Sequence, residues 1–204
     1  MDDQVRSADP DRWLSSRFVD DGGRRADLIA LYAFEAELMA IPTRVTQPLL
    51  AEMRYVWWRE QMEGVFAGRA RKGHPVLEAL TDLVARHSLG QAPFEALIDA
   101  HVGRVQGQPH DLDAFYVGPM QMAVEILAGP GHAADVVDVA RVRGLGHTGR
   151  HDEARRLKPA ANAGIRRLPV EALAAVIPSA LATTSAGSGL RRLKLIWAHA
   201  RRRI

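Results

Sequence analysis

Two helix-forming patterns between Asp27 and Gly68 constrain the fold of this chain more than any other part of its sequence. Apolar residues recur at the spacing of helix faces, and Pro42 disfavours helix at the residue before it, so we expect the first helix to end at Ile41. Its apolar side comprises Leu28, Leu31, Tyr32, Leu38 and Met39. The second helix, which Thr46 is expected to cap, has two apolar sides, one made of Leu49, Leu50, Met53, Val56 and Trp57 and the other of Tyr55, Trp58 and Met62. A helix with two apolar sides is expected to pack between neighbours.

The rest of the chain shows the same helical period, and no strand-like alternation persists long enough to build a sheet. The sequence therefore predicts an all-α fold. We expect a disordered N-terminus over 1–10, a helical domain over 11–182, a flexible linker over 183–189 and a basic amphipathic helix over 190–204. Within the domain, 111–128 is expected to be a helix that Gly118-Pro119 kinks or splits. Residues 143–159 are polar, basic and glycine-bearing, which predicts a loop or a loop with one helical turn.

Composition excludes several classes of site. Of the 204 residues, 47% are hydrophobic and 25% are charged, as is usual for globular proteins. The chain contains no cysteine, which excludes disulfides, thiolate metal sites and a cysteine nucleophile. No apolar run reaches the length of a membrane span. The first residues are polar and acidic, which argues against a targeting peptide, so we expect a cytoplasmic protein.

Charge is divided unevenly along the chain. Residues 141–204 hold 14 lysines and arginines against three acidic residues, a net charge of +11, whereas residues 1–140 hold 13 against 21, a net charge of −8. An acidic body with a basic tail predicts a partner surface, a membrane face or pairing between the two parts.

The last fifteen residues, LRRLKLIWAHARRRI, concentrate this basic charge. Leu190, Leu193 and Trp197 fall on one helical side, and the segment has no acidic residue. Three interpretations are open: the helix docks on the acidic body, it lies on an anionic membrane surface, or it binds nucleic acid. We favour the first two, so the candidate membrane or partner surface comprises Arg191, Arg192, Lys194, Trp197, Arg201, Arg202 and Arg203.

Three sequence words, "ALYAF", "RYVWWREQMEGVFAG" and "HPVLEAL", resemble those of the squalene/phytoene synthases. The likeness covers residues 13–99 closely and the remainder loosely. It implies an all-helical isoprenoid-synthase fold, here shortened in its second half, of the kind that condenses two prenyl diphosphates head to head. In that family two aspartate-rich motifs on facing helices hold Mg²⁺, which binds the diphosphates.

The resemblance also implies that these metal ligands are missing. The aspartate positions that follow the "YAF" word hold Met39, Ala40 and Thr43, and none of these side chains is a carboxylate. The counterpart of the second motif, residues 139–153, carries Arg141 and Arg143, and its two acidic residues are adjacent, so they do not share a helix face. We therefore expect no catalytic residue and no metal site. Mg²⁺ is a cofactor only under the alternative interpretation, a prenyl-diphosphate condensing transferase.

The word "YAFEAEL" is similar to a YAF-x-x-EL word of a non-catalytic branch of this family. That branch includes a mitochondrial assembly factor for respiratory complex I and its bacterial relatives. The similarity implies a peripheral factor that supports a respiratory complex by binding a protein partner or a lipid-like molecule, in the cytoplasm or on the inner face of the membrane.

Four residues are candidates for a remnant ligand pocket: Glu35, Tyr32, Trp57 and Trp58. Glu35 falls within an apolar stripe, where a carboxylate needs a partner. It pairs with an arginine such as Arg54 or Arg59, or it contacts a ligand. The two tryptophans line an isoprenoid cavity or belong to the core. A further pair, His147 and His151, has the i, i+4 spacing of metal ligands but lies in the predicted loop.

Overall fold

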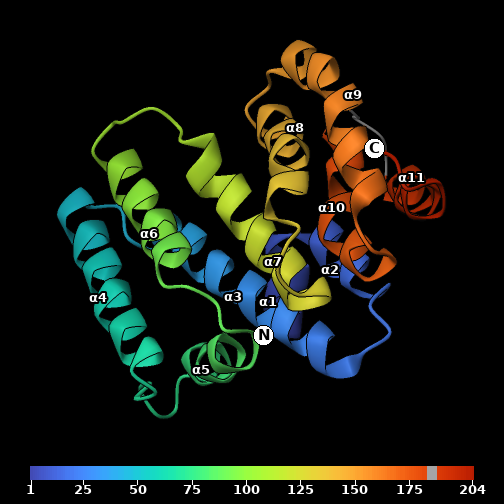
Figure 1. Cartoon of the computed structure of the whole chain (residues 1–204). Coiled ribbons are helices and arrows are strands. Elements are labelled where there is room, and N and C mark those ends of the chain that lie inside the picture. Colours follow the sequence, from blue (N-terminus) through green and yellow to red (C-terminus); the bar gives the residue numbers. More distant parts are fainter. Residues whose placement is uncertain (183–187) are drawn as a thin grey trace.

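A computed structural model describes residues 1–182 and 188–204, and these residues form helices and no strand, which confirms the all-α fold (Figure 1). The flexible linker predicted over 183–189 lies largely outside the described residues. The helical elements are α1 (Asp2–Ala8), α2 (Pro10–Ser16), α3 (Gly22–Arg44), α4 (Pro48–Phe66), α5 (Pro75–His87), α6 (Ala92–Val105), the π-helical η1 (Asp113–Val117), α7 (Gly118–Ala128), the 3₁₀ segment η2 (Ala133–Val136), α8 (Val137–His147), α9 (His151–Arg167), η3 (Val170–Ala172), α10 (Leu173–Val176), η4 (Ile177–Leu181) and α11 (Ser188–Arg201).

Helix α3 is the centre of the molecule. It contacts α1, α2, α4, α5, α6 and α7, and in Figure 1 the helices α4–α6 lie on one side of it and α8–α11 on the other. Every residue from Asp27 to Ala36 is buried, because α3 is surrounded by other helices. The apolar stripe of the sequence thus marks only part of the buried surface of this helix.

Pro42 does not end α3, contrary to our expectation, because the helix continues to Arg44. A proline inside a helix leaves the carbonyl four residues earlier without its usual N–H donor. Here that carbonyl belongs to Leu38, and the hydroxyl of Tyr55 donates a hydrogen bond to it at 3.1 Å. A side chain of α4 thus replaces the missing backbone donor. The start of α4 also differs from the prediction, because its N-cap residue is Gln47 rather than Thr46.

The N-terminus is ordered rather than disordered as we expected. Residues 2–8 form α1, and Val5 is 1% exposed within the core. Asp9 then caps α2, because its side chain accepts a hydrogen bond from the backbone N–H of Arg12 at 3.0 Å. Side-chain contacts add to this, since Gln4 donates a hydrogen bond to Glu37 of α3 and Asp2 pairs with Arg17, so a segment with the composition of a polar tail is held on the body.

The predicted loop over 143–159 is also wrong, because most of it belongs to α8 and α9. These two helices pack closely, and glycines occur where they and their neighbours meet. A Cβ atom on Gly144 would lie 2.6 Å from the ring of Tyr116, and one on Gly164 would overlap the backbone carbonyl of Asp135. Glycine here permits close helix packing instead of marking a loop. Gly118-Pro119, which was expected to kink or split the helix over 111–128, lies where the π-helical η1 passes into α7, and the backbone of Val117 and Gly118 stays helical across this point.

Helix α4 is buried on one apolar side and exposed on the other. Tyr55, Trp58 and Met62 face the core, whereas Leu49 and Met53 are 68% and 60% exposed. In the described part of the chain, α4 therefore does not pack between neighbours as its two apolar sides predicted. None of the described helices is long and apolar enough to cross a membrane.

Candidate functional site

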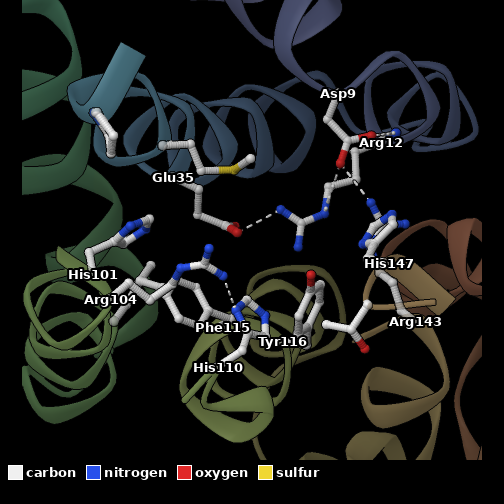
Figure 2. A pocket seen from close by; sticks show the side chains of 14 residues that line it. Asp9, Arg12, Glu35, His101, Arg104, His110, Phe115, Tyr116, Arg143 and His147 are labelled. Atoms are coloured by element: carbon white, nitrogen blue, oxygen red, sulfur yellow. Dashed lines mark hydrogen bonds and ion pairs between the residues drawn. The ribbon is translucent and has the colours of Figure 1, made fainter. Parts of the chain in front are cut away.

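A cavity of about 390 Å³ lies between α2, α3, α6, η1 and α8 (Figure 2). Its polar lining comes from elements far apart in the sequence, and part of its wall is apolar. The apolar lining includes Met39, Pro42, Leu97 and Phe115, and the charged and imidazole groups are those of Asp9, Arg12, Glu35, His101, Arg104, His110, Arg143 and His147.

Arg12 and Glu35 form a buried ion pair at the inner end of this cavity. Arg12 Nη1 donates a hydrogen bond to Glu35 Oε2 at 2.7 Å, and both side chains are about nine-tenths buried. Asp9 joins them to α8, since its Oδ2 lies 3.7 Å from Arg12 Nε and 2.6 Å from Arg143 Nη2. Each carboxylate of the cavity is therefore paired with an arginine, and the network ties α2, α3 and α8 together.

Burial shifts the pKa values of Glu35 and Tyr32 in this network. It raises the pKa of Glu35 above its ordinary value, an effect that the charge of Arg12 opposes. It also raises the pKa of Tyr32 to about 12, and the guanidinium of Arg12 lies 4.6 Å from the centre of the Tyr32 ring. Three buried atoms here have no hydrogen-bond partner in the described chain: Glu35 Oε1, Tyr32 Oη and Arg143 Nε. An ordered water or a ligand in the cavity can satisfy such unpaired buried polar atoms.

A second cationic group lies nearer the solvent. The exposed Arg104 of α6 donates a hydrogen bond to His110 Nδ1 at 2.5 Å, and the His110 ring stacks on Phe115 with ring centres 4.5 Å apart. Burial, and then the charge of Arg104, lower the pKa of His110. Figure 2 shows Arg104 and His110 on the side of the cavity opposite Arg12. The cavity thus presents arginines at both ends, with an apolar wall between them.

The burial of His101 predicts that the stability of the fold depends on pH. Its ring is buried, stacks on Tyr55 and meets the edge of Phe115, and burial lowers its pKa to about 4. An unfolded chain with an ordinary histidine pKa of 6.5 binds the proton that the folded chain rejects, so the stability present above pH 6.5 is lost as pH falls toward 4. We expect this histidine alone to lower the free energy of unfolding by about 2 kcal/mol between about pH 7 and pH 5. Chemical unfolding of wild type and of His101→Phe across this range checks it, and equal pH slopes would contradict it.

The structure corrects the predicted partner of Glu35. The partner is Arg12 of α2, and neither Arg54 nor Arg59 reaches it, since Arg54 is exposed and Arg59 pairs with Asp99 of α6. The reason is that α2, not α4, covers this part of α3. Of the four pocket candidates, Glu35 lines the cavity, and Tyr32 lies against Arg12 beside it.

Trp57 and Trp58 lie elsewhere. They border a separate cavity of about 550 Å³ with His74, and their rings pack edge to face with centres 5.2 Å apart. Trp58 is 4% exposed and meets Phe34 in the core. The structure therefore does not bring the tryptophans together with Glu35, and Trp58 fits the interpretation as a core residue.

The lining residues do not fit a magnesium–diphosphate site. Met39, Ala40 and Thr43 bring no carboxylate to the cavity, and Asp9 and Glu35 are already paired with arginines. Across residues 1–182 and 188–204, no group of three or more His, Asp or Glu side chains is arranged to hold a metal ion. His147 ends α8 and His151 begins α9, where its Nδ1 lies 3.2 Å from the carbonyl oxygen of Ala182.

The basic residues of the tail divide between two roles. Arg191 pairs with Asp11, and Arg202 donates a hydrogen bond to the carbonyl of Leu168, so both hold α11 to the body. Lys194 is half-buried. The other predicted surface residues, Arg192, Trp197, Arg201 and Arg203, are exposed.

Sequence reasoning missed most of the cavity. Arg12, Arg104 and His110 carry no motif, and nothing in their spacing links them to Glu35. Arg143 offered a signal, because it stands in the counterpart of the second aspartate motif, the segment that lines the cavity of a family enzyme. A basic residue at that place indicated that the cavity has gained a cationic group as well as lost its metal-binding carboxylates.

Comparison with known proteins places the chain in a family. The family model described as squalene/phytoene synthase matches residues 5–116, which is more than half of the chain. A search of curated proteins found no significant match. The matched residues include Arg12, Glu35, Arg104 and His110, whereas Arg143 and His147 lie beyond them. The chain belongs to the squalene/phytoene synthase family.

Proposed function

We propose that this protein is a catalytically degenerate member of its family that acts by binding instead of by metal-dependent condensation. One observation carries the proposal: both carboxylates of the central cavity, Asp9 and Glu35, are paired with arginines. A magnesium ion that entered would have to compete with guanidinium groups that are always protonated.

The same cavity favours an amphipathic ligand with an anionic head group. Arg104 is exposed beside the cavity and makes its hydrogen bond to a histidine, so its charge is available to an anion. Guanidinium groups bind carboxylate and phosphate oxygens directly, without a bridging metal. The apolar side chains of Met39, Leu97 and Phe115 then accept the hydrocarbon part. The ligand is thus expected to be an isoprenoid or another lipid-like anion.

A metal-free binding measurement tests this use of the cavity. We expect farnesyl diphosphate, used as a probe, to bind the full chain in the presence of EDTA, and Arg104→Gln to weaken binding about tenfold through loss of one charge-assisted contact. Isothermal titration calorimetry gives both values. Arg69→Gln, at an exposed loop position away from the cavity, is the matched control and should bind as wild type does. Binding that needs Mg²⁺ would contradict the proposal.

The biological role that we propose is assembly or support of a respiratory complex. It rests on the similarity of "YAFEAEL" to the non-catalytic branch of the family and on a cavity suited to binding. Deletion of the protein in its native host is expected to lower the amount of an assembled respiratory complex on native gels, and the wild-type chain should restore it. Unchanged complexes in the deletion strain would refute this role.

The alternative is a prenyl-diphosphate condensing transferase with an altered site. Family membership favours it, because the family model covers most of the residues that line the cavity. It requires carboxylates that leave their arginine partners and bind Mg²⁺. The two functions differ in one product: only the transferase converts prenyl diphosphate to a hydrocarbon.

A further inference from the structure

Helix α11 is held on the body by one of its sides. Leu195 and Ala198 are fully buried against the rest of the molecule, and Arg191 pairs with Asp11 of α2. After the helix, the backbone N–H of Ile204 donates a hydrogen bond to the side chain of Asn162 at 2.8 Å. The helix is therefore a fixed part of the surface, and its other side has a definite orientation.

The opposite side of α11 exposes large apolar residues. Leu190, Leu193, Ile196 and Trp197 are 63%, 63%, 52% and 46% exposed. Their spacing places them along one line of the helix, turned away from Leu195 and Ala198. Figure 1 shows α11 at the edge of the molecule. A contiguous exposed apolar row on a fixed helix marks a site of interaction.

Basic residues flank this row on both sides. At the helical period, Arg201 and Lys194 lie along one flank and Arg192 lies along the other, while Arg203 follows the end of the helix. The sequence contains no acidic residue after Glu171. We define the α11 face as the exposed apolar row together with the exposed arginines, that is, Leu190, Arg192, Leu193, Ile196, Trp197, Arg201 and Arg203.

The positive charge extends beyond the helix. Lys158 of α9 has its pKa lowered by burial and then by the charges of Lys194, Arg155 and Arg203, so four cations gather along this edge. On the α1–α2 side lies a groove of about 420 Å³ whose lining includes Arg191 and Arg192 of α11 and Asp11, which pairs with Arg191. Its other lining residues include Arg6, Pro10, Trp13 and Leu14. The surroundings of the α11 face thus repeat its own combination of apolar and basic groups.

We propose that the α11 face binds the surface of an anionic phospholipid bilayer. Leucine, isoleucine and tryptophan enter the boundary between head groups and acyl chains, and the arginines on both flanks contact lipid phosphates. Charge argues against a symmetric pair of α11 faces, because such a pair would bring the exposed arginines of two copies together. The other exposed apolar row, on α4, lies near acidic residues such as Glu52, Glu60 and Glu63, so the molecule has one apolar face suited to an anionic membrane and another that is not.

Vesicle sedimentation of the full chain tests the proposal. We expect binding to vesicles of equimolar phosphatidylcholine and phosphatidylglycerol, weak binding to phosphatidylcholine alone, and loss of binding at high salt. Two triple variants should each weaken the partition coefficient at least about tenfold: Leu193→Ser/Ile196→Ser/Trp197→Ser and Arg192→Gln/Arg201→Gln/Arg203→Gln. All six positions are exposed, so the fold should survive, and circular dichroism checks this.

Matched variants elsewhere on the molecule serve as controls. Leu49→Ser/Leu50→Ser/Met53→Ser removes a similar apolar row from α4, and Arg54→Gln/Arg69→Gln/Arg71→Gln removes the same charge from exposed positions. Both should bind as wild type does. Equal loss in control and α11 variants would overturn the proposal, as would α11 variants that abolish self-association while vesicle binding stays unchanged.

A fluorescent label locates the contact independently. The chain has no cysteine, so Leu193→Cys and Leu49→Cys each provide one labelling site. An environment-sensitive dye at position 193 should shift to shorter wavelength with anionic vesicles, and the same dye at position 49 should not. A shift at position 49 alone would place the membrane contact on α4 and refute the proposal.

Discussion

Replacement of Arg12 with methionine is expected to lower the free energy of unfolding by about 3 to 5 kcal/mol at neutral pH, because removal of one partner leaves a buried charge without compensation. Arg12 is 8% exposed, and its guanidinium is the hydrogen-bond donor to Glu35 Oε2. Asp9 keeps Arg143 as a partner in this variant, so the cost falls mainly on Glu35. Denaturant unfolding monitored by circular dichroism measures it.

The pH dependence of this variant identifies the cause. Burial already raises the pKa of Glu35, and loss of Arg12 raises it further. The penalty is present above the folded-state pKa and is relieved as pH falls through it, since protonation neutralises the buried carboxylate. Arg12→Met should therefore be closer in stability to wild type at about pH 5 than at about pH 8.

A double-mutant cycle completes this test. Glu35→Leu leaves Arg12 with Asp9 and the Tyr32 ring, so we expect it to keep the fold at a smaller cost than Arg12→Met. The double variant should recover most of the loss, because an apolar pair of similar size replaces the ion pair. Strictly additive losses would show that the two side chains do not act as a pair.

The second large effect is expected for Gly164→Ala. A Cβ atom on Gly164 would overlap the backbone carbonyl of Asp135, which cannot move aside as the end of a flexible side chain can. Helix α9 and the segment η2 would have to separate, so we expect a loss of about 3 kcal/mol or more in the free energy of unfolding. Thermal and chemical unfolding both measure it.

A control for this substitution is available in the same chain. Gly90 lies on the surface, and a Cβ atom at this residue would have no other heavy atom within 4 Å, so Gly90→Ala should change stability by less than about 1 kcal/mol. If Gly164→Ala were as stable as Gly90→Ala, the close packing of α9 on η2 would be wrong.

The helical class and the central position of α3 were predictable, because both follow from local apolar spacing. The continuation of α3 past Pro42 was not, since it depends on the hydroxyl of Tyr55, a residue on another helix. The same holds for the N-terminus, where Val5 is buried in the core and Gln4 donates a hydrogen bond to Glu37, a residue on another helix. Local propensity says nothing about such distant partners.

The candidate site was predictable only in part. Glu35 was a candidate because a carboxylate on an apolar stripe needs a charged partner. The spacing of the stripe does not indicate which arginine is that partner. Arg12 lies twenty-three residues away, and Arg143 lies on α8, beyond the residues that the family model matches. The exposed apolar side of α4 and the two sides of α11 show the same limit. The spacing of apolar residues identifies the apolar faces of a helix. It does not indicate which of these faces is buried against the rest of the chain.

The central claim is that the arginine-lined cavity binds without metal-dependent condensation. The most direct test incubates the purified full chain with farnesyl or geranylgeranyl diphosphate, Mg²⁺ and NADPH, the hydride donor that reduction to squalene requires, with lipid extraction and a pyrophosphate assay afterwards. We predict no squalene- or phytoene-type hydrocarbon and no pyrophosphate release above a control without protein. A hydrocarbon product that appears with Mg²⁺ and disappears with EDTA would contradict the account.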